Sequence, residues 1–323
     1  MDVSPPTTPE QAAPEQRPPS VNLHWPSFAA IILGAGLAIM VSGGGAAALW
    51  GNTVGTFSPH KTSHTAVTAA DLELDRQGPQ QQAEILLERA VTSSDGAADQ
   101  STAQIAAHVE GWRGKLKMDK QLGELTTVAL NSNDRSLRAS AIEVQLAAYG
   151  LTKRESTVDA LVQQAGSSDH AQKIWALWTL GLLGNRGVET DRVVRVLVAH
   201  LLVPHLKDPS RNSDEDLRRW AVESLALVGT TSTIVPLLNA MHDDPSPMVR
   251  ERAACSLAES GMLTHDQRLA AVPQLVNYSD DPALDAQTHA WAFQALADIT
   301  KQHLPNDSAA WRSWYQTSVA SGQ

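Results

Sequence analysis

The chain has 323 residues, of which 42% are hydrophobic, and its 35 acidic and 25 basic side chains give a formal net charge of −10. This length is enough for one large domain or two ordinary ones, each with a buried core. The acidic balance argues against sequence-independent binding of nucleic acid, which needs a basic surface. The single cysteine, Cys255, excludes an intramolecular disulfide and any multi-cysteine metal site.

The first 26 residues are rich in proline, with Thr, Gln, Glu and Ala between the prolines. They offer almost no apolar surface, so nothing would offset the entropy lost on ordering them. We expect residues 1–26 to form a disordered Pro-rich tail. The alternative is that the tail is a PxxP ligand for an aromatic groove.

Residues 27–50 carry no charged side chain and read SFAAIILGAGLAIMVSGGGAAALW. A helix of this length crosses a hydrocarbon core of about 30 Å. Trp25 and Trp50 flank it, where indole rings favour the headgroup level. We expect one uncleaved transmembrane helix. The competing interpretations are a signal peptide cleaved at Ala46–Ala48 and a buried helix of a soluble domain.

The orientation of this span is weakly encoded, because the nearest formal positive charges are Arg17 before it and Lys61 after it. A short tail is easier to leave inside than to push through a membrane. We therefore expect a single-pass protein of the inner (cytoplasmic) membrane, with the C-terminal domain extracytoplasmic. Residues 51–70, rich in Gly, Thr, Ser and His, predict a flexible tether.

Small residues recur at every fourth position of the span. They are Ala30, Gly34, Ala38, Ser42 and Ala46. A face of small residues lets two helix backbones approach closely in lipid. The pattern predicts a parallel homodimer through this face, unless an Ala- and Gly-rich span meets the pattern by composition alone.

From about residue 71 onward the sequence is helical and repetitive. Five segments align on one leucine, at Leu146, Leu180, Leu225, Leu257 and Leu296. A turn with an aspartate precedes each segment, at Asp134, Asp169, Asp214, Asp244 and Asp281. Each aspartate is placed to cap the following helix. A shorter amphipathic segment comes before each turn, so the unit is a helical hairpin of about 32 to 45 residues.

The segment DPSPMVRERAACSLAESG, Asp244–Gly261, resembles the PBS-lyase HEAT-like variant of the HEAT repeat, with its signature D-x-x-V-R-x-x-A-A-x-x-L-G. The resemblance extends from about Leu122 to Thr300. It implies an all-α fold, a right-handed α-solenoid of HEAT-like helical hairpins preceded by the transmembrane helix. In this family the arginine commonly joins an aspartate of an adjacent turn in a ladder. Lys173, Arg218 and Arg250 occupy that position here, with His289 in the fifth unit.

Stacked repeats need covered ends. We expect five repeats over residues 121–303, an N-terminal helical cap over 71–120 and a C-terminal capping helix over 304–323. One face of the N-terminal cap carries Ile105, Val109, Trp112 and Leu116. In the C-terminal helix, Trp311, Trp314 and Tyr315 sit at helical spacing, which predicts packing on the last repeat.

The sequence contains no motif of known chemistry. Its 11 histidines form no HExxH or HxH pattern, and no GxSxG, Walker or dinucleotide-binding motif occurs. We therefore expect no catalytic, cofactor-binding or metal-binding residue and no enzymatic activity. The resemblance alone implies one alternative, an enzyme subunit like the lyases that attach bilins, which rests on fold rather than on a site.

Three features are candidates for binding a partner. Trp175, Trp220 and Trp291 share one repeat position and either face the groove of the solenoid or fill space between repeats. Lys173, Arg218 and Arg250 either form the ladder or bind an acidic partner. The polar insertion KDPSRNSDED, residues 207–216, is either a binding loop or a tolerated surface loop.

These features together predict a membrane-anchored protein-interaction scaffold or adaptor that binds a protein partner on the solenoid surface. The alternative from a different class is a structural envelope protein that acts by self-association.

Overall fold

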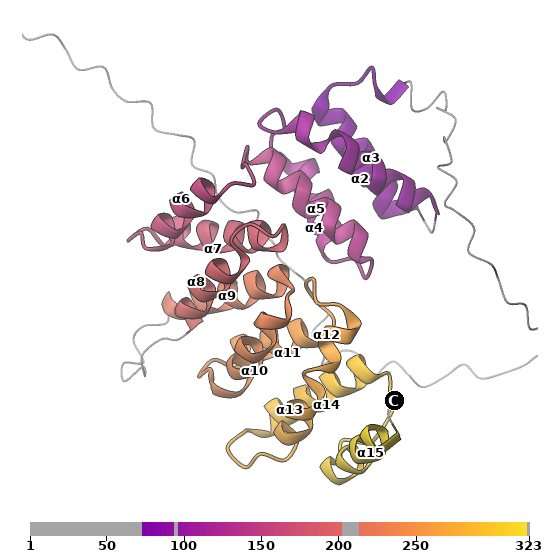
Figure 1. The fold of residues 1–323 in the computed structure, drawn as a ribbon, viewed down its shortest axis with the longest axis vertical. Helices are drawn as coiled ribbons and strands as arrows, with labels where there is room; N and C mark the ends of the chain where they lie inside the picture. Colours follow the sequence, from indigo (N-terminus) through magenta and orange to yellow (C-terminus); the bar gives the residue numbers. More distant parts are fainter. Residues whose placement is uncertain (1–72, 94–95, 202–212, 322–323) are drawn as a thin grey trace, which may run out of the picture. The chain divides into compact units, whose positions relative to one another are not determined.

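A computed structural model describes residues 73–93, 96–201 and 213–321 (Figure 1). The predicted tail, transmembrane helix and tether, the face at Ala30, Gly34, Ala38 and Ser42, and residues 207–212 of the insertion lie outside the described residues. The described ranges contain helices and turns and no β-strand. In these ranges no helix is both long and apolar enough to cross a membrane.

Residues Pro79–Gln323 form one unit, in which helical hairpins follow one another along the chain. The first helices of the successive hairpins are α2 (Pro79–Thr92), α4 (Lys120–Leu130), α6 (Glu155–Ala165), α8 (Thr190–Leu201) and α10 (Ile234–Asp243). The second helices are α3 (Gly96–Trp112), α5 (Arg135–Ala148), α7 (His170–Asn185), α9 (Ser213–Val228) and α11 (Pro247–Ala258). The sequence pattern thus predicts the helical hairpins correctly.

The last hairpin departs from the expected pattern, because its first helix is broken in two. The amphipathic segment before this turn forms two separate helices, α12 (His265–Leu269) and α13 (Val272–Tyr278). Pro273 stands in the first turn of α13 and has no N–H to donate to Leu269. Its ring would also clash with the Leu269 carbonyl in a continuous helix, so the helix must break there. The hairpin is completed by α14 (Ala286–Thr300).

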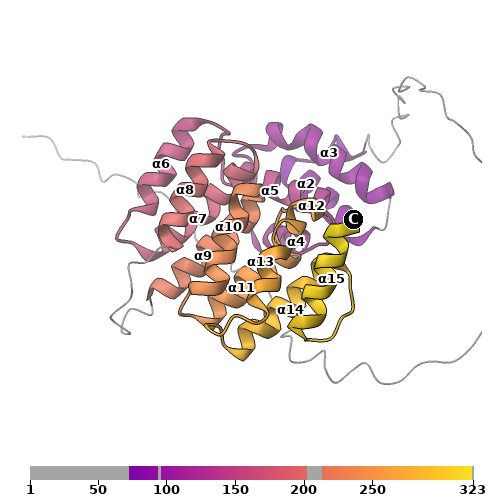
Figure 2. The same ribbon diagram turned by 60° about the horizontal axis from the view of Figure 1, so that its bottom comes forward.

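The second helices pack on one another in chain order, from α3 on α5 through to α11 on α14. Each first helix packs mainly on the second helix of its own hairpin. Two layers result, with the core between them (Figures 1 and 2). All the aligned leucines are fully buried in this core, as the alignment predicts: Leu146, Leu180, Leu225, Leu257 and Leu296 are each 0% exposed.

The turns before the second helices differ in which residue caps the helix. Asp134 and Asp169 cap α5 and α7, and their carboxylates accept from the N–H groups of Ser136 and Gln172. In the last two hairpins the cap is instead Ser246 for α11 and Asp285 for α14, so the expectation for Asp244 and Asp281 was wrong. These two aspartates lie earlier in the turn, where their carboxylates accept from Ser246 N and Ala283 N. The Asp214 side chain lies outside the described residues.

Both ends of the array are covered by helices that bury apolar side chains. Helices α2 and α3 pack on α4 and α5 as the repeats pack on one another, and Ile105, Val109, Trp112 and Leu116 are all buried. At the other end α15 (Ser308–Ser321) packs on α13. Trp311 is fully buried there and contacts Trp314 edge-on at 5.7 Å between ring centroids.

Candidate protein-interaction surface

Arg218 and Arg250 lie buried in ion pairs between neighbouring hairpins. Arg218 of α9 donates from Nε to Asp244 Oδ2 at 2.7 Å and from Nη2 to Asp244 Oδ1 at 3.1 Å. Arg250 of α11 donates from Nη2 to Asp285 Oδ2 at 2.6 Å and from Nη1 to the Asp244 carbonyl at 2.8 Å. These contacts form the ladder that the family resemblance implies. The two guanidinium groups are used inside the array, so we do not assign them to a binding surface.

The other two members of the stripe lie differently. Lys173 is half-buried and forms no ion pair within the part of the chain that the structure describes. His289 of α14 donates from Nε2 to the Asp281 carbonyl at 2.8 Å. The basic stripe therefore does not form one uniform row on the surface.

The tryptophan stripe lies largely between stacked second helices. Trp220 of α9 is 6% exposed, and its ring meets the ring of Trp178 in α7 edge-on, at 5.5 Å between centroids. Trp291 is 8% exposed. Trp175 is half-buried against Tyr149, with the ring centroids 6.1 Å apart. The described contacts of Trp220 are thus those of a residue that fills space between repeats.

At the next interface, a charged pair replaces the tryptophan pair. Arg252 of α11 holds the repeat position of Trp220, and its Nε lies 3.4 Å from Glu223 Oε1 of α9. Arg219 Nη1 lies 3.5 Å from the same oxygen. Burial raises the pKa of Glu223, while the two nearby arginines act in the opposite direction. The sequence does not predict this ion pair, because Glu223 and Arg252 lie in different hairpins and no shared repeat pattern links them.

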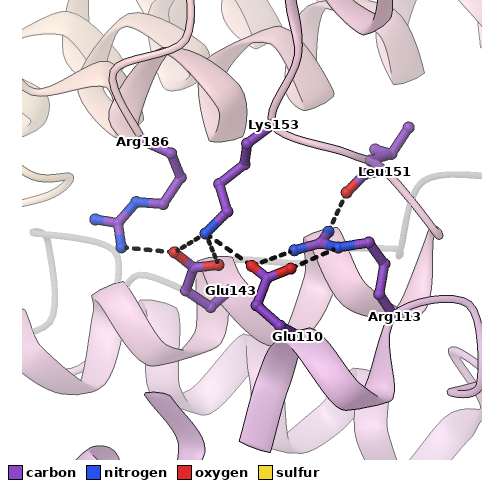
Figure 3. Close-up of polar contacts among 6 residues, drawn as sticks. All are labelled: Glu110, Arg113, Glu143, Leu151, Lys153 and Arg186. Atoms are coloured by element: carbon purple, nitrogen blue, oxygen red, sulfur yellow. Dashed lines mark hydrogen bonds and ion pairs between the residues drawn. The ribbon is translucent and has the colours of Figure 1, made fainter. Parts of the chain in front are cut away.

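A group of charged side chains joins three hairpins at the junction of α3, α5 and α7 (Figure 3). We call Glu110, Arg113, Glu143, Lys153 and Arg186 the α3–α5–α7 charge cluster. Figure 3 shows Lys153 Nζ between the two carboxylates, 3.1 Å from Glu110 Oε1 and 3.0 Å from Glu143 Oε2. Arg186, which caps the end of α7, donates from Nη1 to Glu143 Oε1 at 3.1 Å.

Arg113 closes the other end of the charge cluster. Its guanidinium donates to both carboxylate oxygens of Glu110, at 2.7 Å and 3.1 Å, and to the Leu151 carbonyl. The hydrogen bond from Arg113 is the largest of the effects that lower the pKa of Glu110. The Glu110 side chain is 61% exposed and that of Glu143 only 14%. The charge cluster therefore runs from a half-buried carboxylate out to the surface.

No clear signal in the sequence predicts this cluster. Glu110 and Arg113 are spaced to meet on one helix face, but Lys153 and Arg186 reach it from a turn and from a helix end. Only the packing of α5 between α3 and α7 brings these groups together. Within the described ranges, no group of three or more His, Cys, Asp or Glu side chains is placed to bind a metal ion.

Comparison with solved structures returns designed or engineered proteins of low similarity. A designed armadillo repeat protein in complex with the peptide (KR)4 is 13% identical, with a TM-score of 0.29, over 68% of this chain and 99% of that one. A crystal structure of an engineered protein is 15% identical, with a TM-score of 0.29, over 68% of this chain and 96% of that one. These scores are too low for either likeness to bear on what this chain binds. No curated protein matches the sequence.

Comparison with protein families returns a match to the family of HEAT repeats, over residues 202–297. The matched segment runs from the residues before α9 into α14. It includes the ladder of Arg218, Asp244 and Arg250, and three of the aligned leucines. This part of the chain is therefore similar to HEAT repeats.

Proposed function

We propose that this protein is a protein-interaction scaffold that binds a protein partner on the surface of its repeats. The observation that carries the proposal is the stacking of one helical hairpin on the next, from α2–α3 to α13–α14. Repeats stacked in this way make a continuous core and, around it, an extended surface that suits a large partner. HEAT repeats generally serve in protein–protein interaction, and the family match supports this coarse function.

The α3–α5–α7 charge cluster is the part of the described surface that we propose for the polar rim of the interface. Ladder arginines and Trp220 are engaged inside the array, whereas Glu110 and Lys153 keep 61% and 33% of their side-chain surface exposed. Interfaces commonly surround an apolar centre with such a polar rim.

We further propose that residues 27–50 anchor the scaffold in a membrane, with the repeats on the extracytoplasmic side. This part of the proposal is supported by the uncharged sequence alone. Extraction of native membranes with alkaline carbonate tests it. The full-length chain should stay in the membrane pellet, and its release into the supernatant would contradict the anchor.

Site-specific photo-crosslinking in cells tests the scaffold. A photoreactive residue replaces Met248 at the start of α11, in the second-helix layer, or Val235 of α10, in the first-helix layer. The two side chains are 54% and 62% exposed, so they form a matched pair. We expect one discrete adduct of constant mass from one of the two layers.

The charge reversal Glu110→Lys should weaken this adduct, because it opposes Lys153 and Arg113. An adduct with the mass of two copies of this chain would favour the self-associating envelope protein instead. The absence of any discrete adduct at both positions would contradict the scaffold.

A further inference from the structure

Three arginines meet where the second hairpin contacts the loop between α11 and α12. Arg135, the first residue of α5, donates from Nε to the Met262 carbonyl at 3.2 Å, across 127 residues of sequence. Arg138, one turn later in α5, and Arg268 of α12 lie close enough to repel each other. Helices α5 and α12 lie near each other in both views of the fold (Figures 1 and 2). We call Arg135, Arg138 and Arg268 the arginine cluster.

The two inner members of the arginine cluster are buried and bonded to neutral groups. Arg138 is 7% exposed and Arg268 is 6% exposed. Arg138 donates from Nη1 to the Ser132 carbonyl at 2.8 Å, and its buried Nε has no partner. The guanidinium of Arg268 donates to the carbonyls of Ser256, Leu257 and Ser260, at 2.9, 2.7 and 2.8 Å. Carbonyl groups satisfy donors, but they do not neutralise a positive charge.

The ladder arginines show how this protein otherwise buries a guanidinium. Arg218 and Arg250 are 3% and 9% exposed, which is the same degree of burial, and each forms an ion pair with an aspartate. Within the described residues, Arg138 and Arg268 form no ion pair with a carboxylate. A buried guanidinium without a counter-charge is costly, and arginine does not escape the cost by losing its proton.

The nearby carboxylates do not supply this counter-charge directly. Asp134 acts on Arg138 only through space, because its carboxylate caps α5 through Ser136 N. Glu259 acts on Arg268 in the same way, without an ion pair. Burial, and then repulsion by Arg138, lowers the pKa of Arg268 to about 10, so this group remains positively charged at neutral pH. The pKa of Arg138 is lowered by burial and then by Arg135.

We propose that the arginine cluster binds a phosphate-class dianion, either as free phosphate or as a phosphate monoester. Three guanidinium groups near one another favour a doubly charged oxyanion over a single carboxylate. The guanidinium fork matches the oxygen spacing of phosphate, and such charge-assisted bonds are among the strong hydrogen bonds in proteins. The unpartnered Nε of Arg138 is the donor that such an anion would engage. This site does not depend on the proposed scaffold function.

Calorimetric titration of the full-length chain with inorganic phosphate tests the proposal, with chloride holding the ionic strength constant. We expect Arg138→Met to weaken phosphate binding by at least about tenfold, as expected for loss of a charge-assisted bond. Arg195→Met is the matched control, because Arg195 is an exposed residue of α8 outside the arginine cluster. This control should bind phosphate as the parent protein does.

Thermal unfolding gives a second readout. In chloride without phosphate, Arg138→Met should unfold at a temperature no lower than the parent protein, because it removes an unpaired buried charge. Phosphate should raise the unfolding temperature of the parent but not that of this variant. If Arg138→Met does not fold, Arg135→Met carries the test, because Arg135 is exposed and lies at a helix start.

O-phosphoserine, titrated in parallel, separates the two sources of the anion. Tighter binding of phosphoserine than of phosphate would identify a monoester as the ligand, and equal or weaker binding would identify free phosphate. The proposal is overturned if neither anion binds the parent protein, or if the Arg138, Arg135 and Arg195 variants all bind phosphate as the parent does.

Discussion

The buried ion pair between Arg218 and Asp244 should contribute far more to stability than an exposed pair of similar geometry. The side chains are 4% and 5% exposed, and their shortest N–O distance is 2.7 Å. The substitution Asp244→Asn keeps the size and one oxygen of the side chain but removes its charge. Arg218 is then left buried without a counter-charge, which costs about 3 to 5 kcal/mol in comparable cases.

The amide oxygen that remains after Asp244→Asn can still accept from Ser246 N, as Asp244 Oδ1 does at 2.9 Å. We therefore expect a loss near the lower end of that range, about 3 kcal/mol. The matched control is Asp280→Asn. Asp280 pairs with Arg312 at 2.6 Å, but the two side chains are 44% and 46% exposed. This exposed pair should contribute less than about 1 kcal/mol.

Urea unfolding followed by far-ultraviolet circular dichroism measures both losses. The double variant Arg218→Met/Asp244→Asn should recover at least about 1 kcal/mol relative to the sum of the single changes, because it removes the stranded charge as well. Equal losses for Asp244→Asn and Asp280→Asn would refute the reasoning. A strictly additive double variant would also refute it.

Three further predictions concern the core, the close approach of two hairpins and a titrating histidine. Leu225→Ala, at a fully buried position, should cost about 2 to 5 kcal/mol in urea unfolding. Gly261 and Gly187 both have positive φ, but only at Gly261 would a Cβ come within 2.4 Å of the Ala226 carbonyl oxygen. Gly261→Ala should therefore unfold at lower urea than Gly187→Ala, and equal midpoints would contradict that close approach. Burial lowers the pKa of His242, but hydrogen bonds to two aspartates outweigh it and raise the pKa above 6.5. The contribution of His242 to the free energy of unfolding should therefore be complete below about pH 6.5 and should be lost as pH rises through the raised pKa. The urea midpoint should fall with rising pH over this range, and His242→Gln should reduce that fall.

The repeat register was predictable because its signals are local. An aligned leucine, and before it a turn with an aspartate, recur in each hairpin, so the alignment predicted the burial of Leu225 and its equivalents correctly. Local signals were less reliable at helix ends. Gly184, four residues after the aligned Leu180, lies inside α7, which continues to Asn185, and the glycine with positive φ is Gly187. A Cβ on Gly184 would come within 2.9 Å of Val228, which is a packing reason that the sequence does not display.

Contacts between hairpins were beyond the sequence for a different reason. The sequence did not decide whether the side chain at the repeat position of Trp220 and Arg252 is buried or faces the groove. A repeat position does not reveal which side chain of the neighbouring hairpin contacts it. Here α7 supplies Trp178 to one, and α9 supplies Glu223 to the other. The arginine cluster was harder still, since Arg138 and Arg268 belong to hairpins that are not neighbours in sequence.

The contact between Arg135 and Met262 has a consequence for how the chain folds during synthesis. An array held only by neighbouring hairpins can close step by step as each hairpin leaves the ribosome. Arg135 can form its hydrogen bond only after Met262, 127 residues downstream, has been synthesised. At about 5 to 20 residues per second, that interval lasts roughly 6 to 25 s. During this time Arg135 lacks this hydrogen-bond partner, and the late arrival of the α11–α12 loop then couples hairpins that a simple repeat array would leave independent.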